Sequence, residues 1–98
     1  MGNAERMGQY LSDRLWDLRQ EFRIEGLAEN PRGRGLMRAI DIRSASLRAE
    51  VLTRCFNDGL ILLGCGESGI RFCPALNVTK EEIDVCINIL HSALKAIT

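Results

Sequence analysis

The sequence predicts an α+β fold in which a small, largely antiparallel sheet carries helices on one face. Two observations predict it: amphipathic helical periodicity occupies both ends of the chain, and short apolar stretches bounded by turn residues lie between them. The predicted order is α-β-α-β-β-α. The 98 residues are enough for one domain, spanning residues 1–98.

The first predicted helix runs from Ala4 to Arg23 and is followed by Gly26, a typical helix stop. Its apolar residues recur at three- and four-residue steps: Ala4, Met7, Leu11, Leu15, Leu18 and Phe22. The stretch ENPRGRG (29–35) is then predicted to be a loop, because Pro31 disfavours helix at Asn30 and two glycines follow.

A strand and a second helix occupy the middle of the chain. The strand is predicted from Leu36 to Arg43 on the β-branched pair Ile40 and Ile42. Ser44 or Ser46 is expected to cap the helix. Its apolar stripe is Leu47, Val51, Leu52, Cys55 and Phe56, and Asn57-Asp58-Gly59 marks its end.

Two short strands, LILL (60–63) and IRFC (70–73), are predicted to flank a glycine loop. The last helix begins at a capping box, in which the Thr79 hydroxyl and the Glu82 carboxylate each accept a hydrogen bond from the other residue's backbone N–H. Its buried stripe is Ile83, Ile87, Leu90, Leu94 and Ile97.

Composition excludes several function classes. Thirteen Lys plus Arg balance thirteen Asp plus Glu, so there is no basic field for nucleic acid or anionic membranes. No apolar run approaches the roughly 20 residues of a membrane span, and the amino terminus lacks a signal-peptide pattern. We therefore expect a cytoplasmic protein.

The four cysteines do not have the spacing of a zinc site, and the chain has one histidine. They are Cys55, Cys65, Cys73 and Cys86. Two disulfides remain an alternative, but reduced thiols are favoured because no secretory signal is present. No residues group into a catalytic set or a metal site.

Gly64, Gly66 and Gly69 spell G-x-G-x-x-G, the outward form of a dinucleotide-binding turn. That turn requires a helix after the third glycine, whose amino terminus holds the pyrophosphate. In this chain the following residues alternate in polarity, and Pro74 would disrupt a helix begun at Gly69. The motif therefore predicts a turn before a strand, with no cofactor-binding residue.

The same alternation assigns Arg71 to a sheet face. Ile70 and Phe72 are expected to point to the helix-covered core, which sends Arg71 and Cys73 to the opposite face. A guanidinium there suits a carboxylate ligand. The alternative is a surface arginine paired with a nearby acid. The uncovered face either binds a partner domain or second subunit, or is polar and solvent-exposed.

Two segments together closely resemble the C-terminal small domain of class III pyridoxal-phosphate-dependent aminotransferases. They are RGRGLMRAIDI (32–42) and GLILLGCGESGIRFCPALNVTKEEID (59–84). The resemblance covers residues 11–94. It is strongest to the branch of lysine 6-aminotransferase, 4-aminobutyrate and ornithine aminotransferases. The fold that it implies is the small domain of a fold-type I enzyme.

The resemblance implies that Arg71 binds the substrate carboxylate and that residues 64–69 let its strand approach the active site. It implies pyridoxal phosphate in the complete enzyme, with substrate binding and active-site closure as this domain's part. The family's large domain and its cofactor-binding lysine are absent; Lys80 and Lys95 do not match that lysine's setting, so the chain alone is expected to be inactive.

Cys73, Pro74 and Ala75 depart from the family pattern, in which two prolines often follow the strand. This departure leaves the amino donor open. The alternative function is a free-standing, non-enzymatic α+β module that binds a partner or self-associates through the open sheet face.

Overall fold

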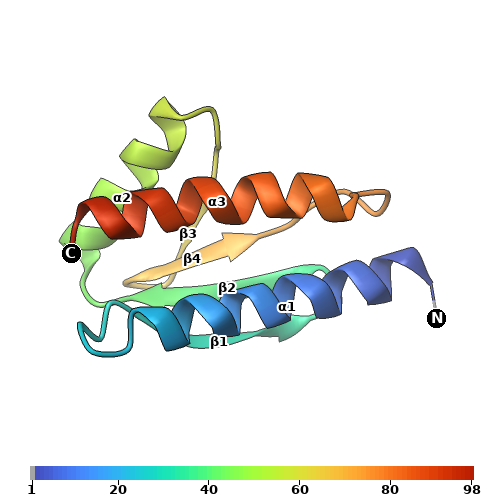
Figure 1. Ribbon diagram of the computed structural model, residues 1–98, viewed down its shortest axis with the longest axis horizontal. Coiled ribbons are helices and arrows are strands. Elements are labelled where there is room, and N and C mark those ends of the chain that lie inside the picture. The colour runs from blue at the N-terminus through green and yellow to red at the C-terminus, as the bar shows by residue number, and fades with distance from the viewer. Residues whose placement is uncertain (1) are drawn as a thin grey trace.

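The computed structural model describes residues 2–98, in which three helices pack with a four-stranded sheet (Figure 1). The chain order is α-β-β-α-β-β-α. The elements are α1 (Asn3–Glu21), β1 (Ala28–Arg34), β2 (Met37–Ile42), α2 (Ala45–Asn57), β3 (Leu63–Cys65), β4 (Gly69–Phe72) and α3 (Lys80–Ala96). No helix among these is long and apolar enough to cross a membrane.

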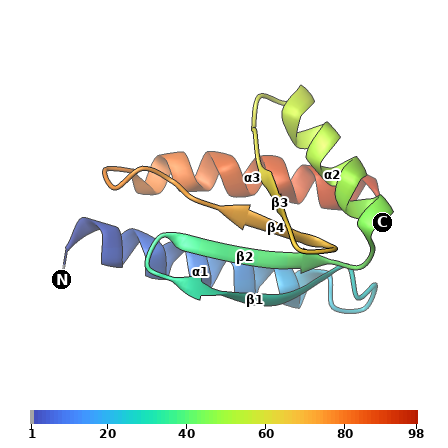
Figure 2. The same ribbon diagram turned by 180° about the vertical axis from the view of Figure 1, so that it is seen from behind.

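The sheet is fully antiparallel and has the order β1-β2-β4-β3. In Figure 1, α1 and α3 lie in front of it; in Figure 2, seen from behind, the sheet lies in front of these two helices. The other face carries no helix in the part of the chain that the structure describes. The predicted α+β fold class is confirmed.

The core lies between this helical layer and the sheet. Ile40 and Ile70, which are register partners on β2 and β4, are both completely buried. The side chains that pack around them come from all three helices: Leu11, Leu15, Leu18, Val51, Cys55, Ile87, Leu90 and Leu94. Their burial accounts for most of the three apolar stripes that the sequence predicts. Phe56, which the prediction placed in the stripe of the second helix, is instead 63% exposed.

The helix starts have the predicted caps. Ser44, the first of the two candidates, accepts a hydrogen bond of 3.2 Å from the Leu47 N–H. The capping box of α3 is also present: Thr79 Oγ1 accepts from the Glu82 N–H at 3.2 Å, and Glu82 Oε1 accepts from the Thr79 N–H at 2.9 Å. Both predicted starts are confirmed.

The predicted loop at residues 29–35 is wrong, because most of it is strand β1. Pro31 rules out a helix but is tolerated at this position, since β1 forms an edge of the sheet and Pro31 lies where its ladder with β2 is interrupted. The ladder with β2 is irregular between Glu29 and Arg32, where Asn30 has a φ of 56°. The proline and glycines that indicated a loop belong to a bulged edge strand.

The predicted strand at residues 60–63 is wrong in position. The Leu60 N–H donates to the Cys55 carbonyl at 2.8 Å, so this stretch first follows the end of α2. Pairing with β4 begins only at Leu63, opposite Arg71, and ends with Cys65 opposite Gly69. The two outer glycines of the motif therefore lie inside strands, and β4 begins one residue earlier than predicted.

Candidate functional site

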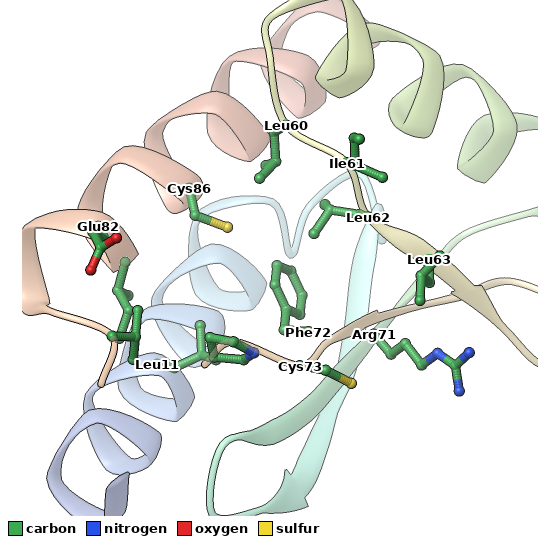
Figure 3. A pocket seen from close by; sticks show the side chains of 13 residues that line it. Leu11, Leu60, Ile61, Leu62, Leu63, Arg71, Phe72, Cys73, Glu82 and Cys86 are labelled. Atoms are coloured by element: carbon green, nitrogen blue, oxygen red, sulfur yellow. The ribbon is translucent and has the colours of Figure 1, made fainter. Parts of the chain in front are cut away.

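Arg71 stands on the sheet face that the helices leave open. Its neighbours Ile70 and Phe72 are 0% and 3% exposed on the helical side, whereas Arg71 itself is exposed, as the alternation predicts. Figure 3 shows its guanidinium pointing away from the apolar side chains around Phe72. Within residues 2–98 it has no hydrogen bond or ion pair, so the alternative of an arginine paired with a nearby acid does not describe it.

A hollow of about 470 Å³ opens beside Arg71 on this face. The register partner of Arg71 on β2 is Ala39, whose short side chain leaves space above the sheet. The remaining lining residues are rich in arginine: Arg32, Gly33, Arg34, Met37, Arg38, Cys65, Phe72 and Cys73. The hollow therefore suits a small anion.

An ion pair crosses the sheet next to this hollow. Arg32 Nη1 on β1 lies 3.0 Å from Asp41 Oδ1 on β2 and donates to the Asn30 carbonyl, also at 3.0 Å. A Cβ on Gly69 would lie 3.0 Å from Asp41 Oδ1 and 3.2 Å from Arg32 Nη2. Gly69, the third glycine of the motif, is thus needed because a side chain at this position would crowd the Arg32–Asp41 ion pair.

The middle glycine, Gly66, lies in the hairpin turn between β3 and β4, and Arg48 of α2 holds this turn. Gly66 has a φ of 62°, which L residues with a side chain rarely adopt. Arg48 Nη1 donates to the carbonyls of Gly66 at 3.0 Å and Gly69 at 3.3 Å, and a Cβ on Gly64 would lie 3.1 Å from the same atom. Since the third glycine begins a strand and no helix, the motif is not a dinucleotide-binding turn.

A second, apolar cavity of about 280 Å³ lies on the helical side of β4 (Figure 3). Leu60, Leu62 and Phe72 line it, and the Cys86 thiol points into it from α3. Burial raises the pKa of this thiol to about 11, with a smaller contribution from Cys55. Because the thiolate is the reactive form, Cys86 is a packing residue and a poor nucleophile at neutral pH.

The remaining residues considered from the sequence lie elsewhere. Neither lysine lines the hollow or the apolar cavity: the Lys80 ammonium lies 5.4 Å from the centre of the Tyr10 ring, and Lys95 is in the last turn of α3. His91 contacts Glu21 at 2.6 Å, which links α3 to α1. Among the described residues, no group of three His, Cys, Asp or Glu side chains could hold a metal ion.

Sequence reasoning missed the contacts of Arg32, Asp41 and Arg48. Because residues 29–35 were predicted to be a loop, Arg32 was not assigned to a strand or to the open face of the sheet. Arg48 falls on a helix in any sequence interpretation, and its contacts with the turn are eighteen and twenty-one residues away. The i, i+2 spacing of Ala39 and Asp41 was the one local signal that both share a sheet face.

Comparison with known proteins gives the family. The model of the aminotransferase class III family matches residues 1–94. The L-lysine-epsilon aminotransferase of Amycolatopsis lactamdurans is 41% identical over 88 residues, 89% of this chain and 19% of that protein. The 4-aminobutyrate aminotransferase of Dictyostelium discoideum is 34% identical over 97% of this chain and 19% of its own length.

The structural comparison agrees. Lysine aminotransferase from Mycobacterium tuberculosis matches with a TM-score of 0.93 and 35% identity, over 98% of this chain and 22% of that one. The chain thus spans about a fifth of the length of these relatives. The family match covers nearly all of the sequence, and the chain belongs to the class III aminotransferases.

Proposed function

We propose that this chain is the C-terminal small domain of a pyridoxal-phosphate-dependent aminotransferase of the lysine 6-aminotransferase or 4-aminobutyrate type. In this proposal Arg71 binds the substrate carboxylate, and the domain helps to close the active site. The observation that carries it is an exposed guanidinium without a partner in residues 2–98, beside a hollow on the open sheet face. The similarity to lysine and 4-aminobutyrate aminotransferases supports the reaction class.

The setting of Arg71 suits carboxylate binding. It lies on β4, which pairs with β2 on one side and β3 on the other, so the backbone that carries it is held by two ladders. A planar guanidinium donates two parallel, charge-assisted hydrogen bonds to a carboxylate. A binding group on a rigid strand loses little conformational freedom when its ligand arrives.

The open face is the proposed contact with the rest of the enzyme, either its large domain or a second subunit. Contact there would exclude water from the hollow and strengthen the attraction between Arg71 and a carboxylate. Ala39 and Leu63, the two register partners of Arg71, would then lie under the bound substrate. This is how we expect the domain to contribute to closure, in a cytoplasmic enzyme.

The residues of this chain do not fit a pyridoxal phosphate site. Both lysines lie away from the hollow, and the amino termini of α2 and α3 are occupied by Ser44 and by the Thr79–Glu82 capping box. We therefore assign cofactor binding, and the bond-making chemistry that the cofactor supplies, to the remainder of the enzyme.

A chimera tests the proposal. Residues 2–98 would replace the matching segment of the M. tuberculosis lysine aminotransferase, and transamination of lysine would be measured. We expect an active enzyme in which Arg71→Ala lowers kcat/KM by about 30- to 150-fold, the loss that corresponds to a charge-assisted hydrogen-bond pair. Arg71→Lys should lose less, because it keeps the charge without the planar fork.

The matched control is Arg54→Ala, which removes another exposed arginine, one paired with Glu50 on α2. It should leave kcat/KM unchanged. Equal effects of Arg71→Ala and Arg54→Ala, or a folded chimera without activity, would contradict the proposal. Unfolding caused by Arg71→Ala would show instead that the residue is structural.

A further inference from the structure

We propose that Arg32 is a second anion-binding residue of the hollow beside Arg71, and that Asp41 lowers the affinity of Arg32 for the ligand. This inference rests on the proposed function, because it concerns the same site. The ligand class is a small carboxylate. The proposal follows from three features: the register of the sheet, the position of the Arg32 guanidinium, and the charges around it.

The register brings Arg32 and Arg71 to the same row of the open face. Arg32 pairs with Ala39 on β2, and Ala39 pairs with Arg71 on β4. The two arginines therefore flank one small residue, with backbones about 10 Å apart, since neighbouring strands are separated by about 4.8 Å. Both line the hollow above Ala39.

The Arg32 side chain closes most of this gap. Its Nη2 would lie 3.2 Å from a Cβ on Gly69, so the guanidinium reaches across β2 to β4. Gly69 precedes Arg71 by two residues on the same face, a rise of about 6.7 Å along the strand. One carboxylate-bearing ligand can therefore contact both guanidinium groups.

Arg32 retains donors for a ligand. Its contacts with Asp41 and with the Asn30 carbonyl both go through Nη1, which leaves Nε and Nη2 available. Arg38, another cation of the hollow, instead donates to the backbone carbonyls of Gly35 and Gly33 at 2.7 and 3.2 Å. Arg34 lies two residues further along β1 than Arg32, opposite Met37, and so is further from Arg71.

Asp41 is the opposing charge. It lies 3.0 Å from Arg32 Nη1 and would lie equally close to a Cβ on Gly69, so its carboxylate borders the place where a ligand anion contacts Arg32. Two carboxylates that share one guanidinium repel each other. Removing the Asp41 charge should therefore raise the affinity for an anion, whereas removing an acid elsewhere should not.

The first test observes the Nε–H signals of arginine in the 98-residue chain by NMR while glutarate is added at constant ionic strength. Arg32→Lys and Arg71→Lys identify the two signals by their loss. We expect both signals to move along one binding curve, and neither to move with glutaramide, which has the same shape without charge. This test needs no destabilising variant.

The second test compares Asp41→Asn with Glu50→Gln. Each removes one carboxylate from an arginine–acid ion pair and changes the net charge equally, but the Glu50–Arg54 pair lies on α2, outside the hollow. We expect Asp41→Asn to lower the dissociation constant for glutarate about two- to fivefold, the scale of one surface charge, and Glu50→Gln to leave it unchanged.

The outcomes separate the two proposals. Movement of the Arg71 signal alone, with equal dissociation constants for Asp41→Asn and Glu50→Gln, would overturn the role of Arg32 and leave that of Arg71 standing. If neither signal moves up to the highest glutarate concentration added, both the role of Arg32 and carboxylate binding at Arg71 are contradicted for this chain.

Discussion

Arg48 Nη1 donates a hydrogen bond of 3.0 Å to the carbonyl of Gly66, eighteen residues further along the chain. The same atom donates to the Gly69 carbonyl at 3.3 Å, so one side chain of α2 binds both ends of the β3–β4 turn. Its Nε is buried without a partner among residues 2–98. Arg48 therefore depends on these two carbonyls, and it ties α2 to the strand that carries Arg71.

Replacing Arg48 with methionine should loosen this hairpin. The change keeps most of the apolar stem and removes both hydrogen bonds, at a cost of about 1–3 kcal/mol in the free energy of unfolding. Urea denaturation measures the loss, and hydrogen exchange should show faster exchange at residues 63–72. Arg54→Met on the same helix is the control; an equal loss there would show that the hairpin contacts contribute nothing.

The three glycines of the motif should respond to alanine in a fixed order. Gly69→Ala should cost most, because its Cβ would lie 2.5 Å from the backbone carbonyl oxygen of Cys65. Gly66→Ala should cost about 1–2 kcal/mol, the price of a positive φ. Gly64→Ala should cost least, since its φ is not positive and its Cβ would meet the Arg48 guanidinium at 3.1 Å but no backbone atom. Thermal or urea unfolding of the three variants gives the order directly.

A different order would show that the turn is held in another way. Equal costs at all three positions would contradict the distinct roles of strand packing, turn conformation and the Arg48 contact. Gly66→Asn is a useful fourth variant, because asparagine tolerates the left-handed region better than alanine. It should therefore recover part of the stability that Gly66→Ala loses.

The sequence was sufficient for features that depend on local chemistry. Periodicity gave the three helices, the Thr79–Glu82 pair gave the start of α3, and alternation around Arg71 gave its face. Each of these follows from residues within a few positions of one another. Arg71 could therefore be assigned to the open face before its surroundings were known.

Features that depend on pairing between distant segments were missed. Pro31 and the glycines after it have turn chemistry, and only the position of β1 at the sheet edge makes them compatible with a strand. The start of β3 depends on where the turn at Gly66 sets the register with β4. Arg32 can reach β4 only when β1 is a strand at the sheet edge and β4 is in its observed register. Both conditions depend on distant segments, so no sequence pattern indicated this contact.

The capping box of α3 should contribute measurable stability. Thr79→Ala removes the hydroxyl that accepts the Glu82 N–H and should lower the free energy of unfolding by about 1 kcal/mol. Ser92→Ala is the control, since it removes an exposed hydroxyl from the same helix away from its ends. Chemical denaturation of both variants checks the prediction, and similar losses would show that the cap is not the cause.

The thiol of Cys55 should make stability depend on alkaline pH. Burial, with a smaller contribution from Asp58, raises its pKa from an ordinary value of 9.0 to about 11. Between these pH values the unfolded chain releases the thiol proton and the folded chain keeps it. Stability from this group is therefore fully present below about pH 9 and is lost as the pH rises towards 11, by on the order of 2 kcal/mol.

Cys55→Ala isolates this effect from other groups that titrate in the same range. The variant leaves a cavity, so it should be less stable than the wild type at neutral pH. It has no thiol at position 55 to ionise when unfolded, so its deficit should shrink as the pH rises from 9 to 11. Urea midpoints across this range measure the difference. A deficit that stays constant with pH would mean that Cys55 has the same pKa in the folded and unfolded chains, and that its burial carries no electrostatic cost.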